Sequence, residues 1–160
     1  MKNSSDIVIS LADAHEHPQV GIFVCALLRE LFPEQAHNFA EATYVAAAVE
    51  LLGDATKVWA MLAKREDRPV GVIVLNECAA IYAGGVFGEI SELYVLPEFR
   101  SKDIGAMLLT AADKFAVEKG WSVLEVGAPG LPRWQSTVDF YLNNGFSVIG
   151  PRMERNTGRE

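Results

Sequence analysis

The stretch Glu92-Leu-Tyr-Val-Leu-Pro97-Glu-Phe-Arg100-Ser-Lys-Asp-Ile-Gly105-Ala106 decides the fold. It predicts a strand that ends at Pro97, a charged loop, and a helix that begins near Asp103. The first N–H groups of a helix lack internal partners and carry about half a positive charge from the helix dipole, so this turn is suited to a phosphate group. Arg100 and Lys102 add positive charge, and Gly105 permits close approach. On physical grounds alone, an ordinary strand–turn–helix remains an alternative.

Helical and strand-like patterns alternate on both sides of this stretch. Upstream, we predict strands over 7–11, 57–63, 70–75 and 89–96, helices over 20–32 and 37–52, and an irregular connection over 76–85. Downstream, we predict a helix from Ile104 to a cap at Gly120, a strand over 123–126, a helix over 135–144 and a closing strand over 146–153. The order β-αα-βββ-α-β-α-β predicts an α+β fold with one central mixed sheet and helices on both faces.

Length and charge limit the classes of protein that the chain can represent. The 160 residues predict a single domain, 1–160, with a core from about 7 to 153. Half of the residues are apolar and 22% are charged, which is typical of a globular protein. The net charge of −7 comes without a basic patch, which speaks against nucleic acid and favours a cationic substrate.

Cysteine usage and hydropathy bear on the compartment. Cys25 and Cys78 lie in unrelated contexts, and the start of the chain does not resemble a secretory segment, so we expect a cytoplasmic protein. The longest apolar run, from Val20 to Leu28, is too short to span a membrane. His15-Glu16-His17 lacks the spacing of a zinc motif, so we expect no metal. A homodimer remains open.

Two patterns resemble one known family. The run from Tyr94 to Pro97, followed by Arg100 and by Ile104-Gly105, resembles the acetyl-CoA-binding segment of GNAT N-acetyltransferases, V-x-P-x-x-[RQ]-G-x-G-x-[GA]. Near the C-terminus, the heptapeptide from Phe140 to Phe146, F-Y-L-N-N-G-F, resembles that family's second signature, F-Y-x-x-x-G-F. The predicted element order is also similar to that family's from about 7 to 153.

The resemblance implies where acetyl-CoA would bind. The strand end at Tyr94, Val95 and Leu96 would pair with the pantetheine arm. Asn144, or its neighbour Asn143, would contact the same arm. Main-chain N–H groups of the following loop and first helical turn would surround the diphosphate. These positions are Arg100, Ser101, Lys102, Asp103, Ile104, Gly105 and Ala106.

The chain departs from the family pattern at three positions. Ser101 and Asp103 stand where the family usually has glycine, and Trp134 stands where an asparagine is common. The Asp103 carboxylate would lie near a diphosphate and repel it, and as a good N-cap residue it could compete for the same N–H groups.

Acetyl transfer to an amine requires a base, a donor to the developing oxyanion and a proton for the leaving sulfur. Glu92 is the candidate base, and Glu89 is the second candidate. Strand alternation places Glu92 on the face of Ile90 and Tyr94, with Glu89 on the opposite face. A solvated strand position remains the alternative for either carboxylate.

The remaining roles rest on the resemblance and on position. Tyr141 would be the acid that protonates the departing thiolate; a core aromatic on an apolar helix face is the alternative. The N–H group of Val95 would donate to the oxyanion. The acceptor pocket would be shaped by Tyr82, Phe87 and Trp134.

The sequence therefore predicts an acetyl-CoA-dependent N-acetyltransferase that acts on a primary amine of a small molecule by direct attack. Two alternatives stay open. One is a GNAT-like binding module in which Asp103 has weakened CoA binding. The other is an unrelated α/β protein that binds a nucleotide at the same helix start.

Overall fold

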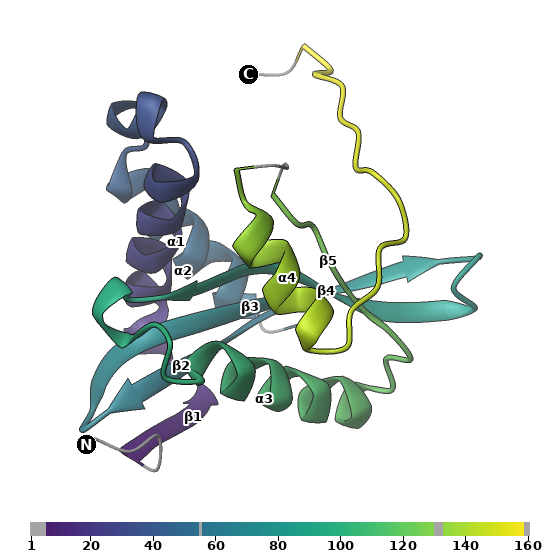
Figure 1. Cartoon of the computed structure of the whole chain (residues 1–160), viewed down its shortest axis with the longest axis horizontal. Helices are drawn as coiled ribbons and strands as arrows, with labels where there is room; N and C mark the ends of the chain where they lie inside the picture. The colour runs from purple at the N-terminus through teal and green to yellow at the C-terminus, as the bar shows by residue number, and fades with distance from the viewer. Residues whose placement is uncertain (1–5, 55, 130–132, 159–160) are drawn as a thin grey trace. The chain divides into compact units, whose positions relative to one another are not determined.

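The computed structural model describes residues 6–54, 56–129 and 133–158, which form two compact units, Met1–Val126 and Gly127–Glu160. The first unit contains a five-stranded sheet of order β1-β2-β3-β4-β5 (Figure 1). Its strands are β1 (Ile7–Leu11), β2 (Val58–Arg65), β3 (Arg68–Ala80), β4 (Gly85–Val95) and β5 (Leu124–Val126). The first four strands pair antiparallel and β5 pairs parallel to β4. This mixed sheet confirms the predicted α+β class.

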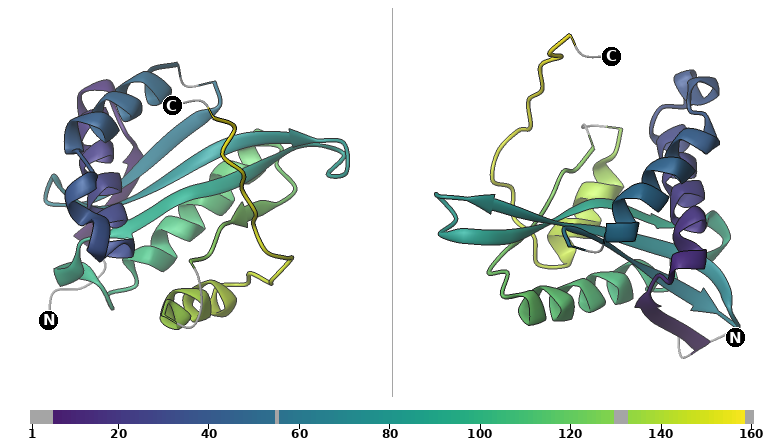
Figure 2. Two further views of the ribbon diagram at one scale, coloured as in Figure 1. Left: turned by 90° about the horizontal axis from the view of Figure 1, so that it is seen from above. Right: turned by 180° about the vertical axis from the view of Figure 1, so that it is seen from behind.

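Helices cover both faces of this sheet, as predicted (Figure 2). Helices α1 (His17–Leu31) and α2 (Glu41–Asp54) lie on one face, and α3 (Ile104–Lys119) lies on the other. Short 3-10 helices occur at Ala14–Glu16, Pro33–Asn38 and Pro97–Phe99. A Cβ atom on Gly21 would lie 2.5 Å from the Cα atom of Val45, so α1 and α2 touch at this glycine. None of the helices within the described ranges is long and apolar enough to cross a membrane.

Strand alternation divides the core into two layers. The layer beneath α1 and α2 consists of Val20, Phe23, Leu52, Ala60, Leu62, Val72, Val74 and Tyr94. On the opposite face, the Trp59 ring of β2 lies 5.3 Å from Phe115 of α3 and 5.8 Å from Trp121. Alternate residues of β2 and β3 thus supply both layers, which explains their nearly continuous apolar sequence.

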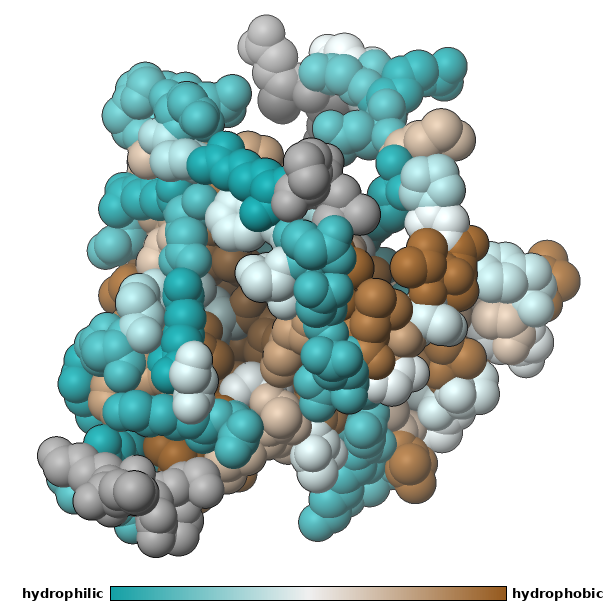
Figure 3. All heavy atoms as spheres, in the orientation of Figure 1, coloured by the Kyte–Doolittle hydropathy of each residue, from teal (hydrophilic) through white to brown (hydrophobic). Residues whose placement is uncertain are grey.

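The predicted irregular connection over 76–85 is wrong. β3 continues to Ala80, and β4 begins at Gly85, so the two strands form a long hairpin. The segment has few β-branched residues, and its extended conformation depends on cross-strand pairing, which a local pattern does not reveal. An apolar side chain reaches the surface at the hairpin tip (Figure 3), where Ile81 is fully exposed.

The second unit contains one helix, α4 (Gln135–Asn143), close to its predicted bounds. Gly145 follows it with φ 89°, which a glycine adopts without strain. The predicted closing strand over 146–153 is wrong, because the described residues there form no strand. Pro151 lacks an N–H donor and Gly150 adopts φ 143°, so the segment is poorly suited to a regular ladder.

Candidate functional site

A β-bulge in β4 brings two carboxylates to one face of the sheet. Val74 pairs with Glu92, but the next residue of β3, Leu75, pairs with Ile90, so Ser91 is an extra residue. Since paired residues point to the same face, Glu92 shares the face of Val74, and Glu89 shares it through its partner Asn76. The predicted separation of Glu89 and Glu92 onto opposite faces is wrong, because simple alternation does not anticipate the bulge.

The surroundings of Glu92 favour the protonated form of its carboxyl group. Burial raises the pKa of its carboxyl, the Ser91 hydroxyl that donates to it lowers that pKa, and the negative charge of Glu89 raises it further. The net direction is upward. A carboxylate with a raised pKa binds a proton more readily than a solvated one.

Glu92 also lines a cavity beneath the first two helices. The cavity measures about 110 Å³ and is bordered by α1, α2 and the three central strands of the sheet. Its lining residues are Val20, Gly21, Val24, Tyr44, Ala47, Ala48, Leu51, Leu52, Val58, Val74 and Glu92. Glu92 is the one carboxylate in this lining, so the cavity is an apolar space with a single acidic group.

Beyond the bulge, one edge of β4 has no partner strand among the described residues. β5 pairs with β4 only from Gly88 to Ile90, whereas β4 continues to Val95. The N–H group of Leu96 donates to Val70 of β3 over 2.9 Å. Because backbone groups alternate along a strand, the N–H group of Val95 points away from β3, toward the open edge. This edge offers main-chain groups to an extended ligand.

The loop between β4 and α3 has a backbone typical of glycine without containing glycine. Ser101 and Asp103 both have φ 63°, in the left-handed region. These are the two positions at which the family pattern has glycine. The loop therefore keeps the glycine conformation at a cost of about 1 kcal/mol or more for each residue.

The start of α3 presents N–H groups without main-chain partners. The first backbone bond of the helix runs from Met107 to the carbonyl of Asp103. Asp103 precedes the helix, and its side chain makes no capping hydrogen bond. Within the described part of the chain, the N–H groups from Ser101 to Ala106 have no backbone acceptor. The loop thus fits an anionic group such as a diphosphate, and Asp103 does not occupy the N–H groups.

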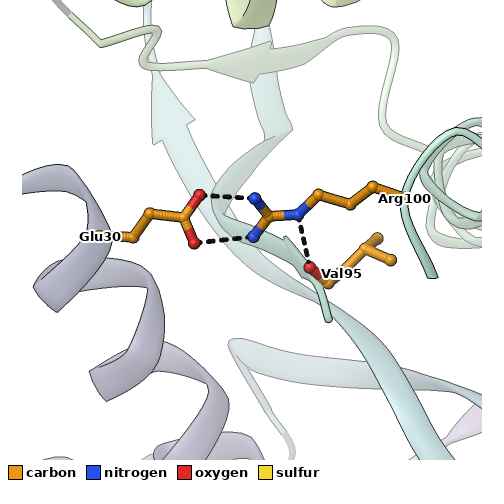
Figure 4. A network of polar contacts seen from close by, with 3 residues as sticks. All are labelled: Glu30, Val95 and Arg100. Carbon is orange, nitrogen blue, oxygen red and sulfur yellow. Dashed lines mark hydrogen bonds and ion pairs between the residues drawn. The ribbon is translucent and has the colours of Figure 1, made fainter. Parts of the chain in front are cut away.

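Arg100 forms contacts that the sequence did not predict (Figure 4). Its two terminal nitrogens donate to the carboxylate of Glu30 in α1 over 2.7 and 2.8 Å, and its Nε donates to the Val95 carbonyl over 2.9 Å. The Glu30 carboxylate raises the pKa of the guanidinium. Arg100 therefore links α1, the end of β4 and the loop, and Glu30 largely neutralises its charge.

The other predicted positions near the loop differ in their surroundings. Tyr94 is buried, with its ring 5.6 Å from that of Phe23. The Lys102 ammonium lies 5.2 Å from the centre of the Phe99 ring and is exposed. Since Glu30 pairs with Arg100, Lys102 is the more available positive charge in this loop.

The second unit holds Tyr141, Asn144 and Trp134. Tyr141 is buried, its ring lies 5.4 Å from both Phe140 and Phe146, and burial raises its pKa to about 12. The Asn144 side chain donates to the Phe140 carbonyl over 2.8 Å. Trp134 directly precedes α4 and lies under the Arg133 guanidinium.

The remaining predicted acceptor residues lie on the hairpin. Tyr82 is exposed in its turn, and Phe87 is buried in β4 with its ring 6.3 Å from Tyr82. Neither residue lines the cavity of Glu92. The residues that line this cavity belong mostly to α1 and α2. In the sequence they are marked only by small residues, alanine and glycine, on apolar helices. The same pattern is typical of two helices that pack closely, so it does not by itself indicate a cavity.

A cluster of possible metal ligands lies apart from this site. Among the described residues, Asp13, His15 and Glu16 bring their ligand atoms within 4.8 Å of one another. Glu16 already pairs with Lys64 and accepts the Asp13 N–H group over 3.0 Å. The Lys64 hydrogen bond is the main reason that the pKa of Glu16 is lowered. The carboxylate thus has a structural role.

Comparison with known proteins assigns the family. The acetyltransferase (GNAT) domain matches residues 54–148, which include β2 to β5, α3 and α4. The chain belongs to the GNAT acetyltransferase family. This membership removes the alternative of an unrelated nucleotide-binding protein.

Individual relatives are similar over part of the chain. An uncharacterized N-acetyltransferase of Archaeoglobus fulgidus is 37% identical over 67 residues, 41% of this chain and 46% of the relative. The aminoalkylphosphonate N-acetyltransferase of Salmonella typhimurium is 34% identical over 85 residues, 53% of this chain and 54% of the relative. The chain thus spans about half the length of these curated relatives.

A solved structure extends the similarity of fold to nearly the whole chain. An aminoglycoside N-acetyltransferase in complex with CoA superimposes with a TM-score of 0.72 at 14% identity, over 96% of this chain and 95% of that one. At this identity, the similarity concerns the fold alone.

Proposed function

We propose that the protein transfers the acetyl group of acetyl-CoA to a primary amine of a small molecule. The observation that carries this proposal is the loop after β4, in which Ser101 and Asp103 keep a left-handed backbone and the α3 start keeps its N–H groups unpaired. A diphosphate is the ligand chemistry that such a loop fits.

Acetyl-CoA supplies an activated thioester and an extended pantetheine arm. The open edge of β4 supports placing that arm beside Leu93 and Val95, where main-chain groups point away from β3. The Val95 N–H group would then donate to the oxygen of the reacting carbonyl. Leu96 and Tyr94 would hold this edge in place through their pairing with β3.

Glu92 would take a proton from the acceptor. An alkylammonium has a pKa near 10, so the amine reaches the site protonated and must lose a proton before it attacks. The raised pKa of Glu92 suits it to this task, either directly or through a water molecule. Glu89 shares its face and remains the second candidate.

Tyr141 would donate the proton to the departing sulfur. Its raised pKa, about 12, keeps the phenol protonated across the neutral range, as an acid requires. Asn144 would contact the CoA arm. The net charge of −7 supports a cationic acceptor. We further propose that one domain, 1–160, carries this activity in the cytoplasm.

The second candidate function is a GNAT-like module that binds CoA or another ligand without turnover. Asp103 favours it, because a carboxylate beside the N–H groups of α3 repels a diphosphate. Glu30 adds to this effect, since it neutralises Arg100.

Two measurements distinguish these functions. Isothermal titration compares acetyl-CoA with ADP, and a panel of primary amines is screened for CoA release by thiol detection. Binding of acetyl-CoA with amine-dependent release is expected. Binding without release would favour the module, equal affinity for ADP would mean that only the nucleotide is recognised, and absence of both binding and release would refute the proposal.

A further inference from the structure

The size and lining of the cavity next to Glu92 indicate which kind of acceptor fits there. We propose that the acceptor is a primary amine with a short apolar tail, which occupies this cavity while the amino group lies at Glu92. The inference rests on the proposed acetyltransferase function and narrows its substrate to short-chain alkylamines, as opposed to amino sugars and other hydroxyl-rich amines.

The wall of the cavity favours carbon over oxygen. Apart from Glu92, the Tyr44 phenol and Gly21, which has no side chain, its lining consists of aliphatic side chains from α1, α2, β2 and β3. A hydroxyl group placed among them would lose its hydrogen bonds to water without finding a partner, which is unfavourable. An alkyl chain has no hydrogen bonds to lose there, and the transfer of its apolar surface from water into the cavity is favourable. The wall therefore selects against sugars.

Charge places the amino group at one point of the cavity. Glu92 is the one titratable group with a raised pKa in the lining, and Glu89 adds a second negative charge on the same face. An ammonium group entering the cavity is therefore attracted to this end. The tail then points toward α1 and α2, where Val20 and Leu52 are buried.

The size of the cavity limits the tail. About 110 Å³ corresponds to roughly four times the volume of a water molecule, so about four carbon atoms fit. Leu51 lines the cavity and is also 54% exposed, so the space opens toward solvent at α2. A longer tail would emerge there without gaining further burial.

A chain-length series tests the proposal. We expect kcat/KM for n-alkylamines to rise about three- to four-fold for each added methylene from ethylamine to about pentylamine, and then to level off. Glucosamine and an aminoglycoside should be acetylated at least ten-fold less efficiently than pentylamine. No dependence on chain length, or a preference for the hydroxyl-rich amines, would overturn the inference while leaving the acetyltransferase function intact.

A matched pair of variants locates the tail. Ala48→Leu fills the cavity from α2, whereas Ala46→Leu makes the same change at an exposed position of the same helix that does not line it. Ala48→Leu should move the plateau to a chain two or three carbons shorter, and Ala46→Leu should leave the series unchanged. Equal behaviour of the two folded variants would place the tail elsewhere and refute the proposal.

Amine binding measured without acetyl-CoA distinguishes a failure of the proposed acetyl transfer from a failure of the proposed acceptor site. If no amine releases CoA, the proposed function fails, and calorimetric titration with n-pentylamine still tests the cavity. Pentylamine should bind at least ten-fold more tightly than ethanolamine to the wild-type protein, and Ala48→Leu should reduce that difference while Ala46→Leu should preserve it. Equal affinities of the wild-type protein for pentylamine and ethanolamine would refute the apolar acceptor site. This result would hold whether or not the protein catalyses acetyl transfer.

Discussion

At the scale of single residues, Asp103 has a backbone conformation that the sequence could not reveal. The stretch after Pro97 allowed the loop and the helix to be predicted, but the left-handed φ of Ser101 and Asp103 is a property of the folded chain. The residue type alone suggests that the Asp103 carboxylate caps α3. The side chain makes no such bond, because the left-handed backbone directs it differently from the extended N-cap geometry.

Two substitutions at Asp103 separate charge from backbone. Asp103→Gly and Asp103→Ala both remove the carboxylate, but only glycine adopts φ 63° without strain. Both variants should bind acetyl-CoA up to about ten-fold more tightly, since a repulsion of roughly 1 kcal/mol or more is lost. Asp103→Ala should be about 1 kcal/mol less stable to urea than Asp103→Gly. Weaker binding by both variants would show that the carboxylate helps the loop.

Glu89 should influence the pH dependence of catalysis. Glu92 works as a base when it is deprotonated, so the rate falls as the pH drops through its pKa, which the charge of Glu89 helps to raise. Glu89→Gln removes this effect and should move the acid limb of the kcat/KM profile to lower pH with the plateau unchanged. Glu118→Gln, on the exposed surface of α3, is the matched control. A collapsed plateau in Glu89→Gln would instead make Glu89 the base.

Tyr141→Phe tests the proposed acid. We expect kcat to fall ten-fold or more, at the lower end of general-acid effects, with unchanged affinity for acetyl-CoA by titration. Because the pKa of Tyr141 is raised to about 12, the wild-type rate should show no loss from phenol ionisation below about pH 11. A rate unchanged by the substitution would mean that Tyr141 only packs between Phe140 and Phe146.

At the scale of elements, most helices and strands could be predicted, and the errors have a common cause. Helix α3 and its cap at Gly120 follow from a local period of apolar residues. The hairpin from β3 to β4 and the bulge at Ser91 depend on pairing between strands, which single-sequence patterns do not contain. The pairing of Arg100 with Glu30 links positions 70 residues apart, so no local signal could indicate it.

Arg100 should act as a link between elements more than as a charge for the ligand. Only a guanidinium can bind Glu30 with two nitrogens and the Val95 carbonyl with a third. Arg100→Lys and Arg100→Gln should therefore lose similar stability, about 0.5–1 kcal/mol because the pair is partly exposed, as measured by urea unfolding. A double-mutant cycle with Glu30→Gln checks the coupling. A fully stable Arg100→Lys would show that charge alone suffices.

At the scale of the whole molecule, binding of acetyl-CoA should appear as a gain in thermal stability. At a concentration of about 100 times its Kd, a ligand that binds only the folded state adds about 2.7 kcal/mol. For a chain of this size, that corresponds to a rise in Tm of roughly 5–10 °C. Differential scanning calorimetry with acetyl-CoA, and with acetyl phosphate as the control, measures the effect. An unchanged Tm at millimolar acetyl-CoA would count against any CoA-binding role.

The extra residue in β4 has a consequence for how this sheet can vary. On each side of Ser91, successive side chains of β4 point to alternate faces of the sheet. The extra residue shifts this alternation by one position between the two parts of the strand. The shared face of Glu89 and Glu92 thus depends on the bulged pairing of β4 with β3 as well as on the identity of the residues. Deleting Ser91 would keep both carboxylates on one face, because Glu89 would then lie two positions from Glu92. Regular pairing of β4 at its present length would instead turn Glu89 to the α3 side, so the acidic end of the cavity would lose one of its two charges without any carboxylate being replaced.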